Sequence, residues 1–268
     1  MSASPQPQSA PFSLTPDPAL LYATPAIKTV MFKARYVVEQ RQGLTCILGD
    51  FGLGKSSVLR SLHAQIAASG EFKTAFLPSP GYPSDFALLK AICGEFGLPP
   101  RRSMLNQETE LRKFLVDLYR ENKTAVVFID EAQRLPGKQM ELIRTLNNFE
   151  TDKVKLIQII LAAQLELQNK LRDPSKRAIR SRIFLPSLLS ALSLPEARDM
   201  LAYRCEQSFV PNPFSDETIK AIYDISQGVP REILKISAAA YALMKMRGEK
   251  SVPAEAIPVI AREATINE

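Results

Sequence analysis

The chain reads Gly49-Asp50-Phe51-Gly52-Leu53-Gly54-Lys55-Ser56 between an apolar run and the start of a helical pattern. This octapeptide fits a known phosphate-binding pattern: glycine, four residues, glycine, lysine, then serine or threonine. Residues 44–48 before it read as a buried strand, and residues 57–62 after it read as the start of a helix. Glycines let backbone N–H groups crowd around a polyphosphate at the positive end of that helix. We therefore expect a phosphate-binding loop between a strand and a helix.

In such a loop the polar side chains have separate tasks. Lys55 would reach the β- and γ-phosphates of ATP, and the Ser56 hydroxyl would hold Mg²⁺. The residues expected to hold the nucleotide are Gly49, Asp50, Phe51, Gly52, Leu53, Gly54, Lys55, Ser56 and Ser57, together with Asp130.

A second apolar run, residues 125–129, ends in two carboxylates, Asp130 and Glu131. An unbroken apolar run indicates a central parallel strand that is buried on both faces. The carboxyl ends of such strands are where α/β sheets bind their ligands. We expect Asp130 to bind Mg²⁺ through water, with Ser56 as the other metal residue. Glu131 would orient and polarise the attacking water.

The bulk composition is that of an ordinary globular protein of 268 residues, enough for one large α/β domain and a small one. The net charge of +6 and the pI near 9.2 are compatible with nucleic acid or another anionic surface, without deciding the question. Three scattered cysteines indicate neither a disulfide framework nor a zinc site, and they fit a reducing cytoplasm. No signal peptide or bilayer-spanning run is evident, so we expect a cytoplasmic protein without a membrane segment.

The pattern along the chain divides it into three parts. Residues 1–25 are expected to form an N-terminal tail, disordered over the first ten residues or so, and an apolar strap docked on the protein. Strands alternate with helices over residues 26–187, which predicts a parallel, three-layer α/β domain whose last short strand covers residues 182–186. Helical patterns separated by Pro and Gly then predict a small all-helical domain over residues 188–268.

A phosphate-loop α/β domain followed by a small helical lid resembles the AAA+ ATPases. Residues 155–167 resemble the sensor-1 strand of ExeA-type ATPases, and Gln164 stands where that family has a glutamine after the strand. Gly228-Val229-Pro230-Arg231 resembles their sensor-2 motif, which implies that Arg231 is the lid arginine reaching the γ-phosphate. Residues 12–18 look like the family's N-terminal signature.

The resemblance also implies an arginine finger. Ser181-Arg182-Ile183 begins the expected last strand, where related AAA+ proteins place this residue. Arg182 would then reach the γ-phosphate of the neighbouring subunit and make hydrolysis depend on assembly. Arg177 and Arg180 are the alternatives, and the three arginines could instead form an ordinary solvated basic face.

Two branches of the family fit this core. ExeA-type secretion ATPases carry a transmembrane helix and a peptidoglycan-binding region after the lid, whereas this sequence ends after the lid. The ATPase subunits of transposition systems, of the TnsC, TniB and MuB type, are soluble, stand alone and assemble on DNA. The lack of a membrane anchor in the sequence and the basic pI favour the second branch.

The transposition branch implies an ATP-driven homo-oligomer, a ring or a helical filament, on duplex DNA. It would recruit a transposase, work with a target-selector protein, and disassemble on ATP hydrolysis. Contacts would be to phosphates without base readout, from Arg101 and Arg102 after Pro100 and from Lys123, although the two arginines could equally belong to a solvated turn. The alternative is a secretion-assembly ATPase with protein partners only. Salt-dependent DNA binding would separate the two.

Overall fold

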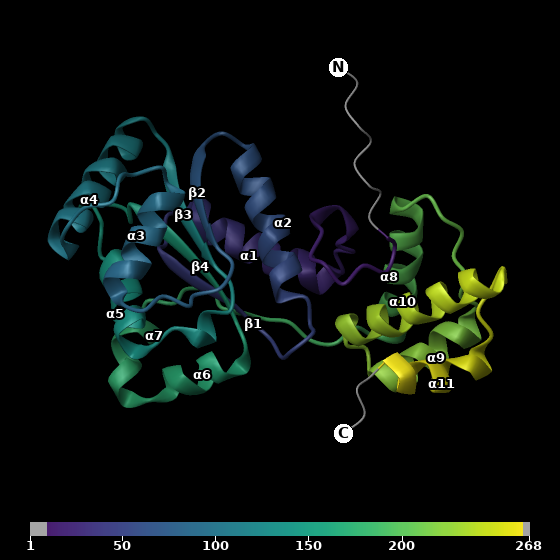
Figure 1. Cartoon of the computed structure of the whole chain (residues 1–268). Coiled ribbons are helices and arrows are strands. Elements are labelled where there is room, and N and C mark those ends of the chain that lie inside the picture. The colour runs from purple at the N-terminus through teal and green to yellow at the C-terminus, as the bar shows by residue number, and fades with distance from the viewer. Residues whose placement is uncertain (1–9, 265–268) are drawn as a thin grey trace, which may run out of the picture. The chain divides into compact units, whose positions relative to one another are not determined.

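The computed structural model describes residues 10–264, which fold into two compact units (Figure 1). The sheet unit comprises Pro25–Phe51 and Val58–Leu189. The helical unit comprises Gly52–Ser57 and the described parts of Met1–Thr24 and Ser190–Glu268. The disorder expected for the first ten residues falls almost wholly outside the described residues. The division into three consecutive domains stays a prediction.

The sheet unit is built on five parallel strands in the order β2-β3-β4-β1-β5. The strands are β1 (Leu44–Leu48), β2 (Phe72–Leu77), β3 (Thr124–Ile129), β4 (Ile157–Ala163) and β5 (Ser187–Leu188). Every residue of β1, β3 and β4 is buried, which explains why these strands read as apolar runs in the sequence. The predicted parallel α/β fold is confirmed.

Helices cover both faces of this sheet (Figure 1). On one face, α3 (Asp85–Glu95), α4 (Met104–Arg120) and α5 (Gly137–Leu146) share a core with alternate strand residues such as Val127 and Ile159. On the other face lie α1 (Pro25–Glu39) and α2 (Lys55–Ala68), where the His63 ring of α2 lies 5.1 Å from the rings of both Phe76 and Phe128. The result is the expected three-layer arrangement.

The position of the last strand differs from the sequence prediction. Residues 182–186 do not form a strand; only Ile183 makes an isolated bridge, to Leu44, and β5 begins at Ser187. Leu185 has a left-handed backbone (φ 47°), and Pro186 has no N–H to donate to a ladder. Arg182 therefore lies before β5, just after the short helix α7 (Arg177–Arg180), which follows α6 (Leu165–Arg172).

Within residues 190–264 the helical unit contains four α-helices, where the sequence pattern predicts three or four. They are α8 (Leu194–Gln207), α9 (Asp216–Ser226), α10 (Pro230–Arg247) and α11 (Ile257–Ala264). Their apolar faces share one core, which also includes Phe12 from the N-terminal segment. Within residues 10–264, no helix combines the length and the apolar character that crossing a bilayer requires.

Residues 10–24, which we call the strap, are held on the helical unit by a buried arginine and a buried aromatic ring. The Arg204 guanidinium on α8 donates to the backbone carbonyls of Pro11, Ser13 and Leu20 at 3.0–3.1 Å. Burial lowers the pKa of Arg204 to about 10. The Phe12 ring is 2% exposed, with centroids 5.3 Å from Phe214 and 5.5 Å from Tyr241. The strap is therefore a component of the helical core.

Phe12→Ala should lower the free energy of unfolding by about 3–5 kcal/mol, because it removes a fully buried ring and leaves a cavity. Urea denaturation followed by circular dichroism measures this loss. Leu14→Ala is the matched control, since the Leu14 side chain belongs to the same strap but is 45% exposed. Equal stability of the two variants would contradict the packing described for Phe12.

Candidate nucleotide-binding site

The glycine-rich loop joins β1 to α2 as the sequence predicts. Gly52 (φ 77°) and Gly54 (φ 87°) have left-handed backbones, which glycine adopts at little cost. Lys55, the first residue of α2, is 6% exposed. The first turn of an α-helix leaves backbone N–H groups without intrahelical partners and carries a partial positive charge, so this turn favours an anion.

The loop contacts the start of α10 in the helical unit. The backbone N–H of Arg231 donates to the carbonyl of Gly52, with an N···O distance of 3.1 Å. A Cβ atom at Gly52 would lie 2.7 Å from the Val229 side chain, closer than real contacts allow. No heavy atom would lie within 4 Å of a Cβ at Gly54. The structure thus brings together the loop and Arg231, two segments that the sequence separates by almost 180 residues.

The two carboxylates follow β3 in the sheet unit. Asp130 is 4% exposed; its backbone N–H donates to the Leu77 carbonyl at 2.9 Å, and its carboxylate accepts from the Glu131 N–H at 2.9 Å. Glu131 has a left-handed backbone (φ 53°), which is uncommon for a residue with a side chain. Its side chain is half-buried.

A glutamine that the sequence analysis missed links Glu131 to the end of β4. The side-chain amide of Gln133 donates to the Glu131 carboxylate at 2.7 Å, and its oxygen accepts from the Gln164 backbone N–H at 3.1 Å. The structure therefore brings Glu131 and Gln164 together at the carboxyl edge of the sheet, with Gln133 between them. The only sequence signal for this role is a polar residue two positions after the carboxylates.

The three candidate finger arginines lie in one short stretch of the sheet unit. Arg182 donates to the side chain of Asn148 at 3.1 Å and to the Ala178 carbonyl at 2.5 Å. Arg180 donates to two backbone carbonyls of the α6 end at 3.2 and 3.3 Å. The Arg177 side chain is exposed and makes no hydrogen bond or ion pair with other described residues.

Two of the three candidate DNA contacts have carboxylate partners. Arg101 pairs with Glu110 and Lys123 pairs with Glu121, each at 2.8 Å. Arg102 is exposed, and its side chain has no ion pair within residues 10–264. Exposed ion pairs contribute little free energy, so neither pair excludes a contact with an external phosphate.

The donor atoms fit a magnesium nucleotide. The loop has two left-handed glycines, a backbone conformation in which successive N–H groups can surround an anion, and Lys55 adds a cation at the helix start. Mg²⁺ takes oxygen ligands and usually keeps several waters, so a serine hydroxyl and one carboxylate are a sufficient protein contribution. Within the described chain no cluster of three or more His, Cys, Asp or Glu side chains forms a separate metal cage.

Three comparisons with known proteins bear on this site. A family model described as "AAA domain" matches residues 38–171. General secretion pathway protein A of Aeromonas hydrophila is 31% identical over 264 residues, which is 95% of this chain and 47% of that protein. The chain thus spans about half the length of this curated relative.

The solved structures show the same fold at low identity. ORC2 of Aeropyrum pernix, in ADPNP–ADP complexes, aligns with a TM-score of 0.72 and 18% identity over 98% of this chain and 73% of its own. Cdc6p of Pyrobaculum aerophilum aligns with a TM-score of 0.74 and 18% identity, over 96% of this chain and 71% of its own. ORC1 of Aeropyrum pernix, in complex with DNA, aligns with a TM-score of 0.69 and 17% identity, over 95% of this chain and 69% of its own.

The family model spans half of the chain, from the end of α1 through the glycine-rich loop and the carboxylate strand to α6. The chain belongs to the AAA domain family and is an AAA+ ATPase.

Proposed function

We propose that this ATPase is a nucleotide-driven switch that assembles as a homo-oligomer on duplex DNA and regulates DNA transposition. In the ATP state it would recruit a transposase, at a site chosen with a target-selector protein, and hydrolysis would release the assembly. The observation that carries the switch is the hydrogen bond between Arg231 and Gly52, because it joins a phosphate-binding loop to the first turn of a lid helix.

The nucleotide site works through residues of separate segments. Residues 49–57 hold the phosphates with backbone N–H groups, and Lys55 neutralises the β- and γ-phosphate charge. Ser56 and Asp130 would hold Mg²⁺, which neutralises charge on the transferred phosphoryl group. Glu131 orients and polarises water. Gln133 holds the Glu131 carboxylate in place through a hydrogen bond. Gln164, directly after β4, would respond to the presence or absence of the γ-phosphate.

Coupling between the glycine-rich loop and α10 follows from the hydrogen bond between Arg231 and Gly52. A change in the loop between ATP and ADP states moves the Gly52 carbonyl, which accepts from the first turn of α10. Arg231 on that turn would also reach the γ-phosphate. The helical unit would then report the state of the nucleotide to a neighbouring subunit.

An arginine acting on the neighbour's nucleotide would make hydrolysis depend on assembly. We propose Arg182 for this role, with Arg177 and Arg180 as the alternatives. Arg182 would have to give up its bonds to Asn148 and Ala178. Each such bond contributes a net free energy of about 0.5–1.5 kcal/mol, which a bound phosphate can offset.

The DNA partner is supported by the net charge of +6, by the sequence resemblance to transposition ATPases and by the shared fold with ORC1, whose structure contains DNA. A second candidate is an assembly ATPase that acts on protein partners. It is favoured by the 31% identity to General secretion pathway protein A.

Binding to duplex DNA should require a slowly hydrolysed ATP analogue and should weaken steeply as salt rises, because cationic side chains displace counterions from phosphates. Fluorescence anisotropy over a salt series measures this, with two unrelated duplexes of equal length. Their affinities should agree, since phosphate contacts carry no sequence information. If no ATP-dependent binding occurs, the protein-partner function takes the place of the DNA function.

Glu131→Gln should retain ATP binding and lower turnover by about 100-fold or more, because an amide cannot accept a proton from water. Phosphate release measures turnover, and a fluorescent ATP analogue measures binding. Glu71→Gln, at an exposed carboxylate before β2, should behave as the unmutated protein. Turnover at the unmutated rate in Glu131→Gln would remove Glu131 from the catalytic role.

Gly52→Ala should weaken ATP binding more than Gly54→Ala does. Both substitutions strain a left-handed backbone, by about 1 kcal/mol, but only the methyl group added at position 52 would collide with the Val229 side chain. Adding Val229→Ala should therefore partly restore ATP binding to Gly52→Ala and leave Gly54→Ala unchanged. An equal effect of Val229→Ala in both backgrounds would mean that the two sites are independent, contrary to the contact.

A further inference from the structure

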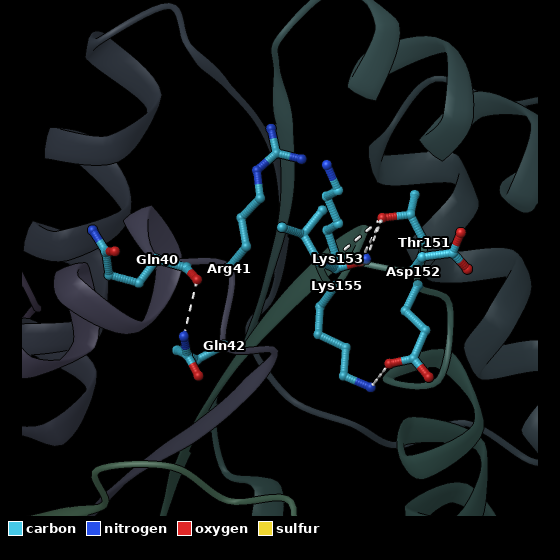
Figure 2. Close-up of a pocket in the computed structure, with 9 residues that line it drawn as sticks. Gln40, Arg41, Gln42, Thr151, Asp152, Lys153 and Lys155 are labelled. Atoms are coloured by element: carbon cyan, nitrogen blue, oxygen red, sulfur yellow. Dashed lines mark hydrogen bonds and ion pairs between the residues drawn. The ribbon is translucent and has the colours of Figure 1, made fainter.

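A polar groove lies at the amino ends of β1 and β4, on the edge of the sheet opposite Asp130 and Glu131. One wall is the turn at residues 40–42 between α1 and β1, and the other is the hairpin at residues 150–155 before β4 (Figure 2). The groove has a volume of about 540 Å³ and opens to solvent. None of the residues assigned to the nucleotide site lines it.

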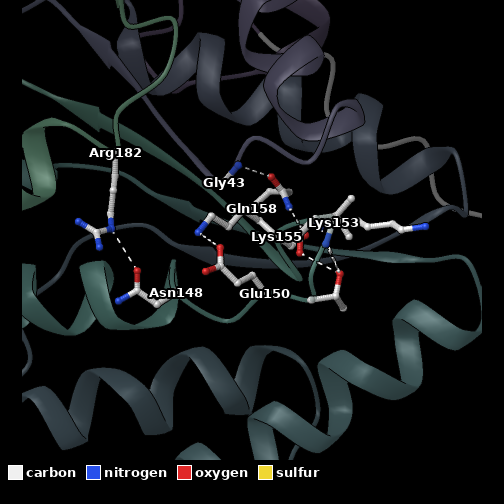
Figure 3. A network of polar contacts seen from close by, with 9 residues as sticks. Gly43, Asn148, Glu150, Lys153, Lys155, Gln158 and Arg182 are labelled. Atoms are coloured by element: carbon white, nitrogen blue, oxygen red, sulfur yellow. Dashed lines mark hydrogen bonds and ion pairs between the residues drawn. The ribbon is translucent and has the colours of Figure 1, made fainter.

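A buried glutamine ties the two walls together. Gln158 lies within β4 and is fully buried; its side-chain oxygen accepts from the Gly43 N–H at 2.7 Å, and its amide donates to the Lys155 carbonyl at 3.0 Å (Figure 3). Lys155 in turn forms an ion pair with Glu150 across the hairpin. The backbone on both sides of the groove is therefore held in place before any ligand binds.

Arg41 extends along the groove from the first wall. Its backbone is left-handed (φ 51°), its guanidinium lies 5.1 Å from the Tyr119 ring centroid, and Nη2 donates to the Lys123 carbonyl at 3.2 Å. Nη1 is buried and has no hydrogen-bond partner within the described chain. Burial lowers the pKa of Arg41. A buried cationic N–H without an acceptor is costly, and an anionic oxygen would relieve that cost.

Lys153 supplies a second cation from the opposite wall. Its side chain is exposed, forms no ion pair with other described residues, and extends in the same direction as Arg41 (Figure 2). The carboxylates of the groove are Glu150, which is paired with Lys155, and Asp152, which is exposed. Lys153 is thus open to an external anion, the half-buried Arg41 adds a cation from the other wall, and Asp152 opposes an anion.

We propose that this groove binds backbone phosphates of nucleic acid through Arg41 and Lys153. The proposal rests on the DNA-dependent function proposed above and identifies a surface that would contact the DNA. The shape favours a polymer, because a small anion is normally enclosed, whereas this groove is open and its cations stand on two walls. Arg41 also donates a hydrogen bond to the backbone carbonyl of Lys123. The groove therefore lies beside Lys123, which the sequence predicts to contact DNA.

Lys153→Gln should lower the magnitude of the log-affinity versus log-salt slope by about one unit, because one phosphate contact is lost. Anisotropy with duplex DNA and an ATP analogue measures the slope. Asp152→Asn should increase the affinity, since it removes the opposing charge. Lys28→Gln is the matched control: Lys28 is an exposed lysine near the start of α1, about 17 Å along the helix axis from the last residue of α1, and should leave the slope unchanged.

The outcomes separate this proposal from the function on which it rests. Absence of ATP-dependent DNA binding by the unmutated protein overturns both. Normal binding by the unmutated protein, with the same slope in Lys153→Gln and Lys28→Gln, overturns the groove alone. If Lys153→Gln weakens the binding of inorganic triphosphate but leaves DNA binding unchanged, the groove is a site for small anions and the proposal is also overturned. Thermal unfolding of each variant confirms that the fold is intact.

Discussion

Burial of β1, β3 and β4 on both faces is the constraint on which the chemistry of the sheet unit depends. A strand between two helical layers has no room for ionised side chains, so charged and hydrogen-bonding groups collect where the strands begin and end. The polar groups at the carboxyl edge are Asp130, Glu131 and the hydrogen-bonded pair Gln133 and Gln164. The cationic groups at the amino edge are Arg41 and Lys153. One sheet thereby presents two polar edges, separated by an apolar core.

Buried polar side chains are retained where the chain lacks a regular ladder. Gln158 satisfies backbone groups at the entries of β1 and β4, and Arg204 satisfies three carbonyls of the strap. In both cases one side chain replaces hydrogen bonds that a strand or helix would otherwise provide. Each also joins segments more than 100 positions apart in the sequence.

The parts of the structure that follow local rules could be predicted from the sequence. The glycine loop, the carboxylates after β3 and the four helices after Ser190 each have a pattern within a few neighbouring residues. The last strand was misplaced because its start depends on the backbone of Leu185 and Pro186. Gln133 and the amino-edge groove were missed for another reason: their roles arise only when β4 pairs with β1 and β3, which no local pattern shows.

The strap has a consequence for the order of events during synthesis. Its binding site on α8 includes Arg204, which lies 184 positions after Leu20, and the aromatic partner Tyr241 comes later still. At a translation rate of about 5–20 residues per second, Phe12 leaves the ribosome at least ~10 s before the core that buries it exists. The sheet unit can form in that interval, but the Phe12 ring stays exposed to water until its partners in the helical core have been synthesised. A nascent chain of this protein would therefore expose one aromatic anchor until almost the last helix is made, which gives a chaperone a defined period in which to bind it.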